Sequence, residues 1–173
     1  GSISFAPEGE GEVAKWLSDD TRHMLAELRP APDQVTIAIN TNQMNIVEQM
    51  CEADLAGTSL ARPDVYRAYR EMTIPAGPEW VEEHIRRLTI NGIQTHFQLA
   101  TNAQLETVER MMRNGTCNVP LILTWVAIGG GFDQPNIYNL ANFVRAVPDG
   151  AVLTLETSML NVLPLNMMAI AMG

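Results

Sequence analysis

The sequence predicts an α/β fold built on a parallel sheet, and three observations support this. Short apolar runs rich in β-branched residues alternate with segments of helical periodicity along the 173 residues. The runs are apolar at successive positions, as in strands that helices cover on both faces. The repeated order of strand then helix is that of βαβ units, in which consecutive strands run parallel.

The composition fits one globular domain, residues 1–173, in which Gly1 and Ser2 are interpreted as the remnant of a tag. The net charge of -9 argues against nucleic-acid binding, because few cations are present to neutralise phosphates. Cys51 and Cys117 form no CxxC pattern, and neither a signal peptide nor an apolar run of transmembrane length occurs. We therefore expect a cytoplasmic protein that does not bind membranes.

The strands are predicted from runs that end at turn residues or polar residues. The four clearest are, in chain order, residues 35–40, 93–99, 119–128 and 151–156. A shorter run at residues 3–5 is a further candidate. Residues 45–77 contain Arg62-Pro63 and Pro75, which predict a long loop with one short helix.

The helices are predicted from where they begin and from an apolar stripe. Their expected first residues or caps are Asp19 or Asp20, Pro78, Asn102, Pro135 and Pro164. The expected inward side chains are Met24, Leu25 and Leu28; Val81, His84, Ile85 and Leu88; Leu105, Val108 and Met112; and Ile137, Leu140, Phe143 and Val144. The last helix is apolar nearly all round, and its methionines are expected in the core.

Two architectures fit this pattern. A five-stranded doubly wound sheet suits the length of the chain, whereas a (β/α)₈ barrel normally needs about 250 residues. Composition and periodicity leave both open. In the doubly wound case the chain would be a flavodoxin-like binding domain, although no phosphate-binding loop follows its first strand.

A set of short motifs in a fixed order favours the barrel. It consists of residues 39–45 (Ile-Asn-Thr-Asn-Gln-Met-Asn), 120–123 (Pro-Leu-Ile-Leu), 128–131 (Ile-Gly-Gly-Gly), 148–151 (Pro-Asp-Gly-Ala), 163–164 (Leu-Pro) and 168–173 (Met-Ala-Ile-Ala-Met-Gly). Through these motifs residues 35–173 resemble the β-keto acid cleavage enzymes. The resemblance implies a TIM barrel, of which this chain contains the part from about the third strand to the helix after the seventh.

The resemblance also implies a reaction. Enzymes of this family condense a β-keto acid with acetyl-CoA and cleave a C–C bond, which gives acetoacetate and a new CoA ester. Partners would be the small keto acid and the CoA thioester, and the protein would form a homo-oligomer. The alternatives are another TIM-barrel lyase or aldolase, or a scaffolding subunit that has lost catalytic groups.

A zinc ion is expected from the family. Its ligands there are a His-x-His pair on the second strand and a glutamate on the eighth, segments that this sequence lacks. The three histidines present, His23, His84 and His96, have no chelating spacing. We therefore expect no metal ligand in this chain.

The resemblance places the candidate catalytic residues at strand ends. The family's fifth strand ends in acidic residues, and here those positions are His96 and Gln98. A glutamine cannot act as a general base, which puts the family's proton transfer in doubt at this position. Glu156 ends the strand at 151–156, where a buried carboxyl group could serve as the base. Gln98 and Glu156 are therefore the candidate catalytic residues.

Four further residues are candidates for substrate binding. Asn40 ends the first clear strand, at the usual place of barrel sites, and Asn45 lies in the turn that follows. His96 shares a strand face with Gln98, and Thr101 follows the same strand. The chain departs from the family at Ala38, where a hydroxyl residue is usual, and at residues 158–161, where an arginine is usual.

Overall fold

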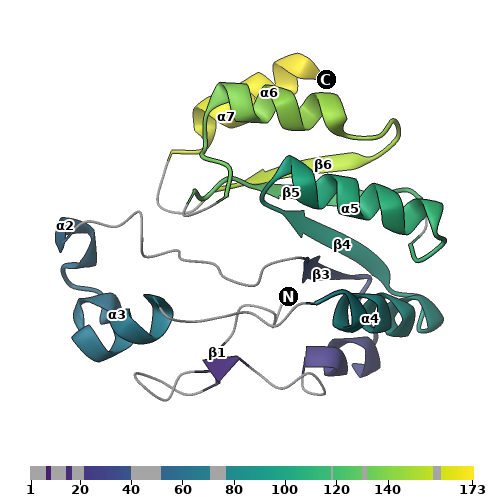
Figure 1. Ribbon diagram of the computed structural model, residues 1–173, viewed down its shortest axis with the longest axis horizontal. Coiled ribbons are helices and arrows are strands. Elements are labelled where there is room, and N and C mark those ends of the chain that lie inside the picture. The colour runs from purple at the N-terminus through teal and green to yellow at the C-terminus, as the bar shows by residue number, and fades with distance from the viewer. Residues whose placement is uncertain are drawn as a thin grey trace.

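The computed structural model describes residues 7–8, 15–16, 22–39, 52–70, 77–117, 119–129, 132–157 and 161–173. Among these residues, the centre of the fold is a four-stranded parallel sheet (Figure 1). Its strands are β3 (Gln34–Ala38), β4 (Gln94–Leu99), β5 (Ile122–Val126) and β6 (Val152–Glu156). Two short strands, β1 (Pro7–Glu8) and β2 (Lys15–Trp16), pair separately and antiparallel.

The strands of the parallel sheet follow one another in sequence order, β3-β4-β5-β6. This confirms the prediction that the four runs are parallel and adjacent. The four strands show no reversal around a central strand, the arrangement that a doubly wound sheet requires. The sheet is open, with β3 and β6 at its edges, and it has the topology of one arc of a TIM barrel.

A helix precedes β4, and a helix follows each of β4, β5 and β6 in the sequence. These helices are α4 (Pro78–Ile90), α5 (Asn102–Arg113), α6 (Ile137–Ala146) and α7 (Leu163–Met172), and they lie along the sheet in Figure 1. The core lies between them and alternate strand residues, among which Ile37, Phe97 and Leu123 are at most 1% exposed. Trp125 packs against Phe143 of α6, with ring centroids 5.9 Å apart.

Strand and helix bounds depart from the predictions in several places. β5 is shorter than the expected residues 119–128, because backbone pairing with its neighbours runs only from Ile122 to Val126, and Val119 is 71% exposed. Residues 52–70 form three short helical segments, α2 (Glu52–Leu55), η4 (Ser59–Ala61) and α3 (Pro63–Arg70), instead of a loop with one helix. The cap of α5 is Thr101, not Asn102, because the Thr101 side chain accepts the backbone N–H of Gln104. Helix α6 begins after the cap Asn136, whose side chain accepts two backbone N–H groups, and not at Pro135.

The inward stripes are also only partly as predicted. The expected first helix is a short 3₁₀ helix, η2 (Met24–Glu27), in which Leu25 is buried while Met24 and Leu28 are exposed. On α7 only Leu165 is buried, and the prediction of core methionines is wrong, because Met167 is 64% exposed and Met168 and Met172 are exposed too. Ile137 is exposed. The predicted strand at residues 3–5 and the caps Asp19 and Asp20 lie outside the described residues.

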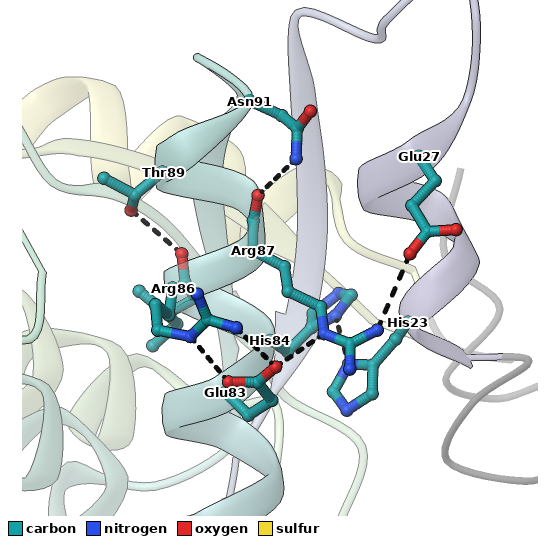
Figure 2. Close-up of polar contacts among 9 residues, drawn as sticks. His23, Glu27, Glu83, His84, Arg86, Arg87, Thr89 and Asn91 are labelled. Carbon is teal, nitrogen blue, oxygen red and sulfur yellow. Dashed lines mark hydrogen bonds and ion pairs between the residues drawn. The ribbon is translucent and has the colours of Figure 1, made fainter.

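The segment that contains η2 packs against α4 through a buried cluster of three aromatic rings and one guanidinium group. The cluster consists of Arg22, His23, Trp80 and His84. The Nδ1 atoms of His23 and His84 are 2.9 Å apart, and the guanidinium of Arg22 lies 4.1 Å from the centroid of the Trp80 ring. Figure 2 shows Arg87 at the edge of this cluster, between Glu83 at 2.7 Å and Glu27 at 3.6 Å.

Candidate functional site

The face of the sheet that points away from the helical core carries a row of polar side chains. This face, called the inner face, would line the interior of a barrel. Alternate residues of β4, β5 and β6 contribute His96, Gln98, Thr124, Thr154 and Glu156. Strand pairing places Gln98, Thr124 and Thr154 side by side, because Gln98 pairs with Thr124 and Thr124 with Thr154.

Three of these side chains form a continuous hydrogen-bonded chain across the sheet. The Nε2 atom of His96 lies 2.7 Å from Oγ1 of Thr124, which lies 2.6 Å from Oγ1 of Thr154. Thr154 in turn lies 3.2 Å from the carbonyl oxygen of Leu123, to which it can donate. The chain ties the side chains of three strands to one another and ends on a backbone acceptor.

A second contact joins the two candidate catalytic residues. Nε2 of Gln98 on β4 donates to Oε2 of Glu156 on β6 at 3.0 Å, so that the pair reaches across β5. The other amide atom of Gln98, Oε1, is buried and has no hydrogen-bond partner. Turning the amide over would place this oxygen against the carboxylate of Glu156, which is why the carboxylate fixes the orientation of the amide.

The electrostatics of the inner face are simple among the described strand residues. Glu156 carries their only formal charge on this face, and burial lowers the pKa of His96 while the nearby carboxylate of Glu156 opposes that change. His96 is therefore neutral at pH 7. Glu156 is exposed, not buried. It lies at the last position of the edge strand β6, where no further strand among the described residues covers it.

The carboxyl ends of the strands are braced by a buried glutamine that the sequence analysis did not single out. Gln104, in the first turn of α5, binds the backbone of both Ile39 and Ala100. Thr101, a candidate for substrate binding, caps the same helix, and its Oγ1 accepts a hydrogen bond from the backbone N–H of Gln104 at 3.3 Å. The spacing Thr-x-x-Gln is that of a capping box and would have identified Gln104 as a residue that points back toward the strand end.

The structure brings some candidates together and leaves others undescribed. Gln98 and Glu156 are in contact, and His96 lies on the same face but is bound to Thr124 instead. Asn40 and Asn45 lie outside the described residues, although Asn40 directly follows the buried Ile39. Thr124 and Thr154 were missed because threonine in an apolar run is an ordinary strand residue.

Residues 9–173 match the family model described as beta-keto acid cleavage enzyme. The chain belongs to the β-keto acid cleavage enzyme family. The family is enzymatic, and the parallel sheet with its consecutive strand order agrees with the barrel that was expected from the resemblance. A search of curated proteins gave no match. Within the described part of the chain, no helix is long and apolar enough to span a membrane.

The zinc ion expected for β-keto acid cleavage enzymes does not fit the described residues. They contain no group of three His, Cys, Asp or Glu side chains that could hold a metal ion. On the inner face, Nε2 of His96 is already within hydrogen-bond distance of Thr124, and one oxygen of Glu156 accepts from Gln98. Two such ligands are fewer than the three that protein zinc sites need.

Proposed function

We propose that the inner face binds a small β-keto acid and orients it for cleavage with acetyl-CoA as the second substrate. The acyl group of the keto acid would leave as a CoA ester, and the acetyl group would join the remaining two carbons as acetoacetate. The observation that carries the proposal is the Gln98–Glu156 pair, which presents a carboxylate and a buried, unpartnered amide oxygen at the carboxyl end of the sheet.

The two residues of the pair would have different tasks. The carboxylate of Glu156 is exposed and held by one hydrogen bond, so its other oxygen is available to accept a proton from the carbon between the two carbonyl groups. Gln98 cannot accept that proton, since a carboxamide is not a base at neutral pH. It would instead hold Glu156 in place and accept a hydrogen bond from the bound substrate through Oε1.

Other side chains would complete the binding surface. Neutral His96 lies on the same face and can form a hydrogen bond through its second ring nitrogen. Thr101, which follows β4, would be a further substrate-binding residue, as would Asn40 and Asn45, which follow β3 in the sequence and lie outside the described residues. The function is thus binding and proton transfer by groups of this chain, and no step is assigned to a metal.

The test uses the full chain with a panel of β-keto acids and acetyl-CoA. We expect Glu156→Gln to lower kcat by about 10²- to 10⁴-fold, because it removes the proton acceptor. Gln98→Met should weaken keto acid binding, measured by calorimetry, by about 1–3 kcal/mol. Glu106→Gln is the matched control, since Glu106 is an exposed glutamate on α5, away from the inner face. Full activity in Glu156→Gln would refute the assignment of the base.

One observation favours a second candidate function, a subunit that binds a keto acid without turning it over. The resemblance implies that Gln98 stands where the family carries an acidic residue, which would leave this chain with one carboxylate fewer on the described inner face. The same experiment distinguishes the two. Binding of a keto acid by the wild-type chain without formation of acetoacetate would favour the degenerate subunit, whereas formation of acetoacetate would exclude it.

A further inference from the structure

Gln104 makes two hydrogen bonds that join the ends of neighbouring strands. Its side chain is 4% exposed and leaves the first turn of α5 toward the carboxyl edge of the sheet. Nε2 donates to the carbonyl oxygen of Ile39 at 2.9 Å, and Oε1 accepts from the backbone N–H of Ala100. Ile39 follows β3 and Ala100 follows β4, and both residues are buried.

The two hydrogen bonds of Gln104 lie just beyond the backbone pairing of β3 with β4. The last pair between β3 and β4 is Ala38 with Gln98, so the carbonyl of Ile39 and the amide of Ala100 lie just beyond the pairing. A carboxamide has the same donor and acceptor as a peptide group, and Gln104 therefore continues the hydrogen bonding of the sheet from a helix. Without it, a buried backbone donor and a buried acceptor would lose their partner.

The two backbone groups that Gln104 binds lie next to residues assigned to the site in the sequence. Ile39 directly precedes Asn40, and Ala100 lies two positions after Gln98. The carbonyl oxygen of Ala100 also accepts from the backbone N–H of Asp133 at 3.0 Å, which adds the loop after β5. Gln104 thus connects the ends of β3 and β4, and through Ala100 the loop after β5, on the edge where the Gln98–Glu156 pair is presented.

We propose that Gln104 is a positioning residue for the cleavage reaction. It holds the carboxyl end of β3 against that of β4, which carries Gln98, so that the Gln98–Glu156 pair keeps its position when a substrate binds. It contacts backbone groups and no reacting atom. This role rests on the proposed function, because it needs a substrate that is bound by the Gln98–Glu156 pair.

Three variants of the full chain test this role. Gln104→Met keeps the length of the side chain and removes both hydrogen bonds. Gln104→Glu keeps the acceptor for Ala100 but, when ionised, places a carboxylate against the carbonyl of Ile39. Val108→Ala is the control, because Val108 is a fully buried residue of the same helix in the main core, and its loss destabilises the fold by packing alone.

The readouts are kcat and KM for β-keto acid cleavage at a temperature where all variants are folded, together with backbone amide exchange over residues 99–105. We expect Gln104→Met to lose about ten- to a hundredfold in kcat/KM through displacement of the strand ends, and its amide protection at Ala100 to fall. Val108→Ala should stay within about twofold of wild type in kcat/KM. The kcat/KM of Gln104→Glu, relative to wild type, should recover as the pH falls from 8 to 5.5, because a protonated carboxyl group can form both bonds.

Each outcome of these measurements either supports or contradicts the positioning role of Gln104. A large loss in Gln104→Met with low-pH recovery in Gln104→Glu supports the positioning role. Equal losses in Gln104→Met and Val108→Ala at matched stability, or unchanged kcat/KM in Gln104→Met despite faster exchange at Ala100, would overturn it. A wild-type chain that neither binds nor cleaves any keto acid of the panel overturns the proposed function first and this role with it, so the two failures are distinguishable.

Discussion

The buried cluster at the start of α4 predicts a loss of stability in mild acid. The pKa of His84 is lowered from 6.5 to about 4. Burial is the largest cause, followed by repulsion from the positive charge that His23 gains on protonation and from the charges of Arg22 and Arg87. In the folded protein His84 is therefore neutral where the unfolded chain already binds a proton. Stability is fully present above pH 6.5 and declines as the pH falls toward 4.

The size of the effect follows from the two pKa values. They differ by about 2.5, and at about 1.4 kcal/mol for each pH unit the full loss is about 3 kcal/mol, of which about 2 kcal/mol falls between pH 7 and 4.5. Glu83 does not contribute to the change in stability at the upper end of this pH range. Its pKa is lowered to about 2 by its hydrogen bonds to Arg86 and Arg87. Glu83 loses its contribution only below its unfolded pKa of 4.5.

The assay is urea unfolding at several pH values from 7 to 4.5, with His84→Asn as the reference. An asparagine can keep a polar atom near the position of Nδ1, within reach of His23, but it does not titrate. We expect the free energy of unfolding of the wild type to fall by about 2 kcal/mol more than that of the variant over this range. Parallel pH profiles for the two proteins would refute the assignment of the acid sensitivity to His84.

Three further predictions concern stability. Phe143→Ala removes a fully buried ring that packs on Trp125 and should lower the free energy of urea unfolding by about 3–5 kcal/mol with an unchanged slope. Thr124→Val removes the hydroxyl between His96 and Thr154 and should cost about 1–2 kcal/mol, whereas Thr124→Ser should cost less; equal losses would argue against the hydrogen-bonded chain. Gly150→Ala forces a side chain onto a residue with φ of +81° and should lower the melting temperature, while Ala146→Gly at the exposed end of α6 serves as a comparison.

The strands could be predicted because the apolar residues along each run match the side chains that are buried in the sheet. Runs such as residues 93–99 combine β-branched and aromatic residues between turn signals, and the parallel direction of the strands follows from the alternation of strand and helix in βαβ units. The stripe of α4 was predicted correctly, with Val81, His84, Ile85 and Leu88 all buried. Resemblance was needed to choose a barrel, since periodicity does not specify strand order.

The candidate site was less predictable for physical reasons. Gln98 and Glu156 lie 58 positions apart in sequence on two different strands, and only the register of the sheet brings them into contact. The exposure of Glu156 depends on which strands flank β6, and the sequence of β6 does not contain that information. Gln104 was missed because placing the cap at Asn102 instead of Thr101 conceals the capping-box spacing.

The consecutive strand order has a consequence for how the chain folds. Pairing β4 with β5 closes a connection of residues 100–121, and pairing β5 with β6 closes residues 127–151, whereas β3 with β4 must close residues 39–93. A connection about twice as long adds about 0.6 kcal/mol of closure entropy. The unit from β4 to β6, with α5 and α6, is therefore expected to form first, and β3 to dock last. Pulse-labelled hydrogen exchange should then show protection of residues 122–126 before residues 34–38, and the reverse order would contradict this folding sequence.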